Sequence, residues 1–338
     1  MKESGPFFEK CLDATRHISA DAAILGQSLT FHRQMGAFAG LMAIAVILFS
    51  FPVRFHAALP RLLLLPVAIG VVTSVLLPGV WACWEWKRQW FPKVLELTLT
   101  AIWIATVWAL SWLLAQVAAR SPFAMADSMF ARMDSHIIQT VSIVRWINGY
   151  PLLRTVFTLA YASLDPLVVL AFIAPILCGR FADSRRLLLA ITVSFFPTIG
   201  LFALFPAVGP WIIEGFQPSA TQAPVGPYLI ALKSGITPSG AELSGIVAFP
   251  SFHTILALLA GASLSKIRRL RWIAGAVAVG VCIGTVTTGW HYVVDVMAGS
   301  LVATVSWFTA SALSSSHSAQ TDNVAGSARM VQLDVERA

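Results

Sequence analysis

Long apolar segments determine what this chain can fold into. A helix needs about 20 predominantly apolar residues to cross the hydrocarbon core of a bilayer. Roughly eight such runs occur in the 338 residues, of which only 12% are charged. They lie at about 35–53, 62–84, 95–118, 153–178, 186–208, 252–265, 270–288 and 292–312. So much apolar surface cannot be buried in one soluble core, so the bilayer must serve as the solvent.

The predicted architecture is all-α, a polytopic transmembrane bundle with a six-helix core preceded by a two-helix hairpin. Residues 120–150 mix charged and apolar residues, as is typical of a helix in the membrane interface. Pro166 should kink the fourth helix. We expect an N-terminal segment 1–34, transmembrane helices in 35–119 (the third joining the core), a main membrane domain 120–312 with a polar loop at 209–245, and a disordered tail 313–338.

The distribution of Lys and Arg predicts the orientation. Cytoplasmic loops carry an excess of these residues. Of the 23 in the chain, 16 fall in one set of loops, which includes 180–186 and 266–271. The other seven are Arg54, Arg61, Arg120, Arg132, Arg145, Arg154 and Lys233. We expect an inner-membrane protein with both termini cytoplasmic and with 120–150 and 209–245 outside. The charge of +7 then reflects topology, and nucleic acid is not an expected partner.

Two polar clusters interrupt the apolar background. Phe-Pro-Ser-Phe-His-Thr at 249–254 opens the sixth run, and Gly-Trp-His-Tyr-Val-Val-Asp at 289–295 opens the eighth. In the predicted topology both runs cross from outside to inside, so His253 and His291 lie at the same depth near the outer face. The topology is predicted from Lys and Arg alone, without the histidines. Their equal depth is therefore independent support for a shared site.

The spacing within the clusters suggests how they could act. His291 and Asp295 are four residues apart, so on a helix they share a face. The carboxylate can then accept a hydrogen bond from one ring nitrogen, leaving the other as a nucleophile or base. His253 can approach from a neighbouring helix as a proton donor. These are the candidate catalytic residues.

The start of the sixth run also suits a phosphate. Pro250 fits a first helical turn and Ser251 fits a cap. The N–H groups of Ser251 and Phe252, with the positive end of the helix dipole, would form an anion seat. A largely dry site also needs a basic side chain to neutralise phosphate. The outward candidates are Arg145, Arg154 and Lys233, each of which could instead anchor a helix at the interface.

Other interpretations remain open. Intramembrane His and Asp residues also serve as helix-packing hydrogen bonders or proton relays, so a lipid or small-molecule transporter or flippase is an alternative. A non-catalytic scaffold is another. The four cysteines form no CxxC pair, and no further His or Cys completes a zinc shell around the His/Asp pair, so we expect no metal and no cofactor. Asp134 and Asp165 could pack helices or contact a head group.

P-S-F-H at 250–253 followed by H-Y-x-x-D at 291–295 resembles the phosphatidic acid phosphatase type 2 superfamily. The sequence is most similar to the branch that contains inositol phosphorylceramide synthases, whose second motif reads F-P-S-x-H; F-P-A-V-G-P at 205–210 is also similar to that branch. The resemblance covers about 125–310. It implies that His291 attacks phosphorus to form a phosphohistidine, that Asp295 orients His291, and that His253 protonates the leaving alcohol without a metal.

The resemblance further implies a lipid phosphatase or phosphotransferase at the outer membrane face, with a lipid phosphate or phospholipid as substrate. Water or a lipid alcohol would resolve the phosphohistidine. The sequence departs from the superfamily at its cations. Phe202 and Gly209 stand where the first motif has Lys and Arg, and Gly284 and Thr285 stand where the third has Ser-Arg.

Overall fold

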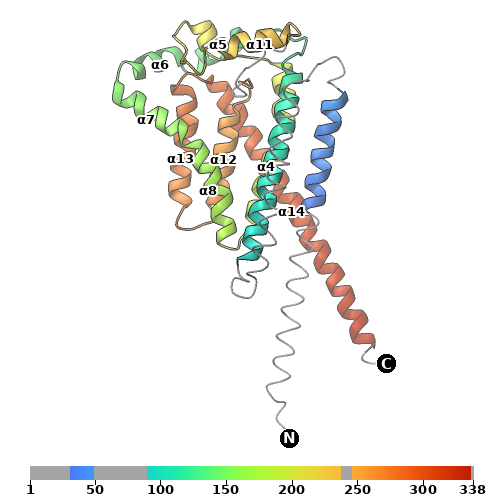
Figure 1. Ribbon diagram of the computed structural model, residues 1–338. Coiled ribbons are helices and arrows are strands. Elements are labelled where there is room, and N and C mark those ends of the chain that lie inside the picture. Colours follow the sequence, from blue (N-terminus) through green and yellow to red (C-terminus); the bar gives the residue numbers. More distant parts are fainter. Residues whose placement is uncertain (1–30, 49–89, 237–245, 336–338) are drawn as a thin grey trace. The chain divides into compact units, whose positions relative to one another are not determined.

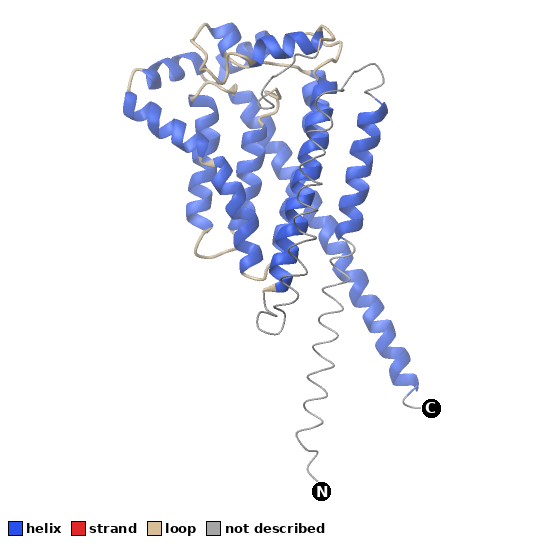
Figure 2. Cartoon of the chain, in the orientation of Figure 1, coloured by secondary structure: helices blue, strands red, loops and turns tan. Residues whose placement is uncertain are grey.

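The computed structural model describes residues 31–48, 90–236 and 246–335 (Figure 1). All regular structure in these ranges is helical and none is strand, which confirms the predicted all-α class (Figure 2). The helices are Phe31–Leu48, α4 (Phe91–Ala118), α5 (Asp127–Ile137), α6 (Thr140–Asn148), α7 (Pro151–Ala162), α8 (Leu164–Leu177), α9 (Phe181–Leu204), α10 (Trp211–Glu214), α11 (Val225–Lys233), α12 (Phe252–Leu264), α13 (Arg271–Thr287) and α14 (Val293–Val335).

Five helical segments of the described part are long and apolar enough to cross a membrane, and α12 and α13 are shorter apolar helices. The five are Phe31–Leu48, Pro92–Ala118, Pro151–Leu177, Phe181–Leu204 and Val293–Ser314. Together these segments account for all the predicted apolar runs except 62–84, which lies outside the described residues. The chain is therefore a polytopic membrane protein.

The chain forms two compact units. One comprises Met1–Phe38 with Ser311–Ala338, of which 31–38 and 311–335 are described. The other comprises Ala39–Ala310 and contains every residue of the candidate site. The predicted division at 34, 119 and 312 remains a prediction.

Within the larger unit, α4, α8, α9, α12 and α13 run side by side, while α5, α6 and α11 lie across one end, at the top of Figure 1. The basic turns at 178–180 and 265–270 lie at the opposite end. There Nη1 of Arg180 donates a 2.5 Å hydrogen bond to the carbonyl oxygen of Lys266. The two basic loops thus share one side of the bundle, as the charge distribution predicts.

The fourth apolar run is broken close to Pro166, as predicted. α7 ends at Ala162 and α8 begins at Leu164, with Ser163 between them. Proline has no N–H to donate, and its ring clashes with the carbonyl four residues earlier, which here belongs to Ala162. The break lets α7 and α8 run in different directions (Figure 1).

Three segments differ from the expected outline. The interfacial segment 120–150 contains two helices, because the chain turns at Ile138, where Oδ2 of Asp134 accepts a 2.7 Å hydrogen bond from the Thr140 hydroxyl. The loop 209–245 contains α10 and α11, and its residues 237–245 lie outside the described part. The expected disordered tail continues α14 to Val335, since elongating an existing helix avoids the cost of nucleation.

α12 is closely packed within the bundle. α12 packs against α8, α9 and α13. A Cβ atom added at Gly261 would lie 3.1 Å from the Cβ of Ala278, so a small residue allows α12 and α13 to approach closely.

At the basic end, Arg185 of α9 forms a bidentate ion pair with Glu96 of α4, at 2.7 and 2.5 Å, with both side chains largely buried.

Candidate active site

His291 lies in the turn before α14 and is held by Asp295 in the first turn of that helix. Oδ2 of Asp295 is 3.3 Å from Nδ1 of His291 and accepts a 2.9 Å hydrogen bond from the N–H of Tyr292. Both side chains are buried, with 3% and 0% exposed. The sequence spacing predicts a shared helix face, but α14 begins at Val293, so the contact is made by a carboxylate reaching back to the preceding turn.

The surroundings of His291 favour a neutral ring. Burial lowers its pKa to about 4 because a charged ring would lose its hydration, and a hydrogen bond with the backbone of Ala248 opposes the shift. An ionised Asp295 carboxylate can accept but not donate, so it favours a proton on Nδ1. The lone pair then lies on Nε2, the nitrogen suited to nucleophilic attack.

The start of α12 is joined directly to the start of α14. Ser251 caps α12 as predicted, since its Oγ accepts hydrogen bonds from the N–H and the hydroxyl of Thr254 at 3.3 and 3.1 Å. Its own N–H donates to the carbonyl oxygen of Asp295 at 3.0 Å. A Cβ atom at Gly299 would lie 2.6 Å from the carbonyl oxygen of Ser251, so α14 packs tightly against the cap. The sequence predicts Pro250 in the first turn of the helix, but α12 begins only at Phe252, and Pro250 precedes the cap.

The two histidines lie together. The ring centroids of His253 and His291 are 5.6 Å apart, with the planes tilted by 59°. The hydroxyl of Tyr161, in α7, lies 2.7 Å from Nε2 of His253, and the two rings stack with centroids 4.8 Å apart. Both histidines stand at the end of the bundle that α5 and α6 cover, which is the arrangement that the two motifs predict. Nothing in the sequence pattern marks Tyr161.

Two carboxylates of α5 hold the turns around the site. Asp134 is fully buried and accepts hydrogen bonds from the N–H groups of Val293 at 2.8 Å and Val294 at 3.1 Å, so it caps α14. Asp127 accepts bonds from the N–H groups of Val208 and Gly209 and from the Tyr292 hydroxyl. Burial raises the pKa of Asp127, although these N–H groups oppose the shift.

The sequence left the role of Asp134 open and did not single out Asp127. Their spacing of seven residues does place them on one face of an amphipathic helix, and that spacing is the available signal. Gly209, whose N–H donates to Asp127, has a φ of +141°. A Cβ atom at this position would lie 2.3 Å from the Trp211 ring. The F-P-A-V-G-P segment thus forms a turn that only glycine fits at this position.

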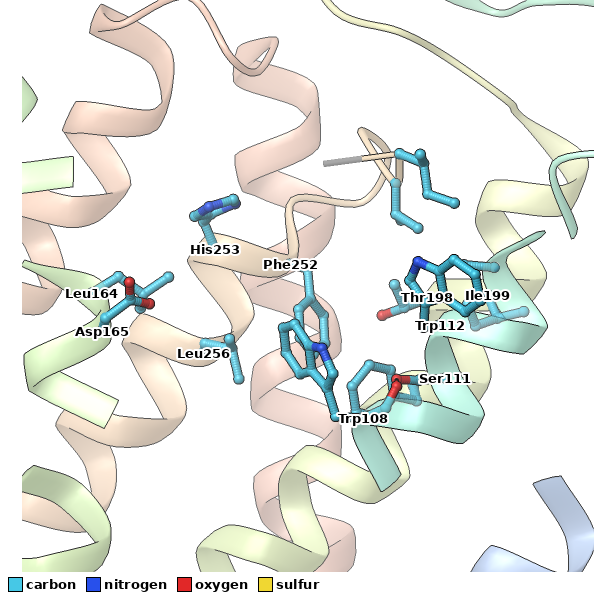
Figure 3. A pocket seen from close by; sticks show the side chains of 14 residues that line it. Trp108, Ser111, Trp112, Leu164, Asp165, Thr198, Ile199, Phe252, His253 and Leu256 are labelled. Atoms are coloured by element: carbon cyan, nitrogen blue, oxygen red, sulfur yellow. The ribbon is translucent and has the colours of Figure 1, made fainter. Parts of the chain in front are cut away.

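A mainly apolar cavity of about 350 Å³ opens beside His253 (Figure 3). It lies between α4, α8, α9 and α12. Trp108 and Trp112 of α4 face it from one side, and His253 and Asp165 lie at the other (Figure 3). Phe252 also lines this cavity and stacks on Phe195 with centroids 4.6 Å apart.

A second cavity, of about 490 Å³, is lined by many polar side chains and lies between α6, α7, the end of α13 and residues 216–222. Tyr161 and Trp290 form part of its wall, and their rings are parallel with centroids 6.2 Å apart. Among the described residues, Arg154 is the one charged residue that lines it. The remaining polar lining residues are Asn148, Thr158, Gln217, Ser219, Thr221, Gln222, Thr287 and Thr288.

The other candidate phosphate-binding groups have different surroundings. Nζ of Lys233 donates hydrogen bonds to the carbonyl oxygens of Ser121 and Phe123, at 2.9 and 2.7 Å. Arg145 is exposed in the last turn of α6 and lines neither cavity. Lys233 is thus used to hold the loop after α4, and Arg154 is the predicted cation that faces a cavity at this end.

The first turn of α12 supplies only part of the predicted anion seat. The N–H and hydroxyl of Ser251 are both occupied, by Asp295 and Thr254. The N–H of Phe252 makes no hydrogen bond within the residues that the structure describes. Within the same residues, no group of three or more His, Cys, Asp or Glu side chains is arranged to hold a metal ion.

Comparison with known families shows that the model of the PAP2 superfamily matches residues 129–309. The matched region begins in α5 and ends in α14, so it contains both histidines, Asp295 and Tyr161. Comparisons with curated proteins and with solved structures give no match.

Proposed function

The chain belongs to the PAP2 superfamily, whose model covers more than half of it, and we propose that it transfers the phosphoryl group of a membrane lipid through a phosphohistidine on His291. Membership of this superfamily supports a lipid phosphatase-like enzyme that acts within the bilayer. The covalent intermediate, the acceptor and the orientation in the membrane are the parts that we propose.

The proposed first step is attack of Nε2 of His291 on phosphorus. The neutral ring offers a lone pair, and the carboxylate of Asp295 stabilises the positive charge that the ring gains as the N–P bond forms. The bond from phosphorus to the lipid oxygen breaks. That oxygen takes a proton from His253, whose ring centroid lies 5.6 Å from that of His291.

In the second step a hydroxyl compound attacks the phosphohistidine. His253, now neutral, takes the proton of the attacking oxygen, and the N–P bond breaks to restore His291. If the attacking molecule is water, the enzyme is a phosphatase. If it is a lipid alcohol, it is a phosphotransferase like the inositol phosphorylceramide synthases that the F-P-A-V-G-P and P-S-F-H segments resemble.

The two cavities suggest how the lipid is held. We propose that apolar chains occupy the cavity lined by Trp108 and Trp112, and that the phosphate end points toward the polar cavity lined by Arg154. A guanidinium offers paired N–H donors to phosphate oxygens. The N–H of Phe252 at the positive end of α12 would add a further donor.

We further propose that this end of the bundle faces outward across an inner membrane, with both termini cytoplasmic. The loops at the opposite end carry Arg180, Lys266 and Arg268, and Arg185 lies in the first turns of α9 at that end, in agreement with the positive-inside rule. The histidines therefore lie near one membrane face. A transporter would instead be expected to hold such groups near mid-bilayer.

The observation that carries this proposal is the pairing of two adjacent histidine rings, one of them held by a buried carboxylate. To test it, the purified full-length protein is incubated with a panel of lipid phosphates and phospholipids, with and without alcohol acceptors. His291→Ala should abolish turnover, and Asp295→Asn should reduce it about 10²–10⁴-fold. His136→Ala is the matched control, since it removes an exposed imidazole from α5 at the same end. Wild-type turnover in His291→Ala would refute the proposal.

The role of Arg154 is tested in the same assay. Arg154→Met should raise KM for a lipid phosphate about 10–100-fold, because a charge-assisted hydrogen bond to phosphate is lost. Lys233→Met, which removes a cation of the same outer region, should leave KM within about twofold, because its ammonium group is bound to backbone carbonyls. An equal rise in KM in the two variants would contradict the assignment.

A further inference from the structure

Tyr161 makes a short polar contact with His253. Its hydroxyl lies 2.7 Å from Nε2 of His253, whereas the nearest carboxylate oxygen of Asp295 lies 3.3 Å from His291. Within the described residues, no other hydrogen bond to the His253 ring is present. The orientation of this ring is therefore set by Tyr161 and by the start of α12.

Packing fixes Tyr161 from two sides. Its ring stacks on His253, with centroids 4.8 Å apart, and lies parallel to Trp290. The backbone is also constrained, because a Cβ atom added at Gly284 of α13 would lie 2.9 Å from the backbone nitrogen of Tyr161. Tyr161 lies far in sequence from both motifs, and its side chain is thus held in place against the proposed proton donor.

We propose that Tyr161 is the positioning residue of His253: its hydroxyl oxygen accepts the proton on Nε2, so that Nδ1 is the nitrogen that gives and takes the transferred proton. This inference rests on the proposed phosphohistidine function. The proton on Nε2 stays in place through both steps. Nδ1–H protonates the leaving lipid oxygen, and Nδ1 later takes the proton of the attacking hydroxyl compound.

The two histidines have different hydrogen-bond partners, a hydroxyl for His253 and a carboxylate for His291, and each partner suits the proposed role of its histidine. His291 becomes positively charged when it attacks phosphorus, and the carboxylate of Asp295 stabilises that charge. His253 must release a proton, and a carboxylate bonded to it would stabilise the charged ring and make it a weaker acid. An uncharged hydroxyl orients the ring with much less of this effect. Asp165, which lines the same apolar cavity, is the charged side chain that faces this region from α8.

The test is Tyr161→Phe, which keeps the ring stack and removes only the hydroxyl. With an alkyl lipid phosphate, whose leaving oxygen needs the proton, kcat should fall about tenfold while KM changes little. With an activated aryl phosphate, whose leaving group needs no proton, kcat should stay within about twofold. Tyr228→Phe is the matched control. It removes one tyrosine hydroxyl, which donates to Gln116 at 2.9 Å, and should affect both substrates equally or not at all.

The ratio of the two rates does not depend on the amount of folded protein, so a loss of stability cannot mimic the result. In a His253→Ala background, Tyr161→Phe should cause no further loss with the alkyl substrate, since the residue acts through His253. An equal loss on both substrates, or a loss that persists without His253, would overturn the inference. If His253→Ala itself showed no leaving-group dependence and His291→Ala remained active, the proposed function would fail instead.

Discussion

The backbone N–H of Ser251 donates a 3.0 Å hydrogen bond to the carbonyl oxygen of Asp295. This bond links the cap of α12 to the first turn of α14, so the two helices that carry the catalytic candidates cannot shift independently. The positions of His253 and His291 are therefore fixed by backbone contacts, in addition to side-chain packing. A phosphoryl-transfer site needs such a fixed separation, because attack and protonation occur on opposite sides of one phosphate.

Gly299 should be essential for this junction. Gly299→Ala would place a Cβ atom 2.6 Å from the carbonyl oxygen of Ser251, which must move the cap of α12 away from α14. We expect kcat to fall about tenfold or more, together with a lower Tm. Gly275→Ala is the control, since a Cβ atom there meets nothing within 4 Å and alanine favours the helix. Equal activity in the two variants would show that the junction does not position the histidines.

Asp134 should stabilise the fold through α14. Asp134→Ala leaves the buried N–H groups of Val293 and Val294 without their carboxylate partner, at a cost of about 1–3 kcal/mol. The control is Asp183→Ala, which removes an ion pair with Arg180 that is partly exposed and worth about 0–1 kcal/mol. Thermal unfolding in detergent measures both variants. A smaller loss for Asp134→Ala than for Asp183→Ala would contradict the capping role.

Several of these features follow from the sequence, for identifiable reasons. Polar residues are costly in an apolar run, so His253 and His291 were conspicuous, and Ser251 was recognisable as a cap from local chemistry alone. Pro166 predicted the break between α7 and α8 because its effect acts on the neighbouring turn. These predictions depend on residues within a few positions of one another.

The remaining features depend on long-range contacts that one sequence does not reveal. Tyr161 meets His253 across 92 positions, and Asp134 meets Val293 across 159. A tyrosine or an aspartate in an apolar helix has many possible partners, so its role appears only when the helices are placed. The spacing of His291 and Asp295 predicts that both lie on one helix, but His291 precedes α14. The start of α14 is set by contacts with Asp295 and with the distant Asp134, and the second of these is not visible in the sequence.

The stability of the protein should fall in acid because of His291. Its pKa is lowered from 6.5 to about 4, so between these values the unfolded chain takes up a proton that the folded protein does not. The contribution of His291 to stability is therefore fully present above about pH 6.5 and is lost as the pH falls toward about 4, at a cost of about 3 kcal/mol. Melting curves over this range should show a smaller decrease for His291→Gln. An equal decrease in wild type and His291→Gln would assign the effect to other groups.

The orientation in the membrane can be tested by cysteine labelling in a cysteine-free background. Ala220→Cys lies in an exposed part of the loop between α10 and α11, and Ser265→Cys lies exposed at the end of α12. An impermeant thiol reagent should label Ala220→Cys in intact cells and Ser265→Cys only after permeabilisation. The opposite pattern would place the site at the cytoplasmic face.

Trapping the phosphorylated enzyme tests the central claim most directly. The His253→Ala protein is mixed with a radiolabelled aryl phosphate, whose leaving group needs no proton, and quenched rapidly in alkali, which spares phosphohistidine and destroys acyl phosphates. We predict label on His291, located by peptide mapping, and none in a His253→Ala/His291→Ala protein. Label that survives an acid quench but not the alkaline one, as an acyl phosphate does, or continued turnover in the protein that lacks His291, would contradict nucleophilic attack by this histidine.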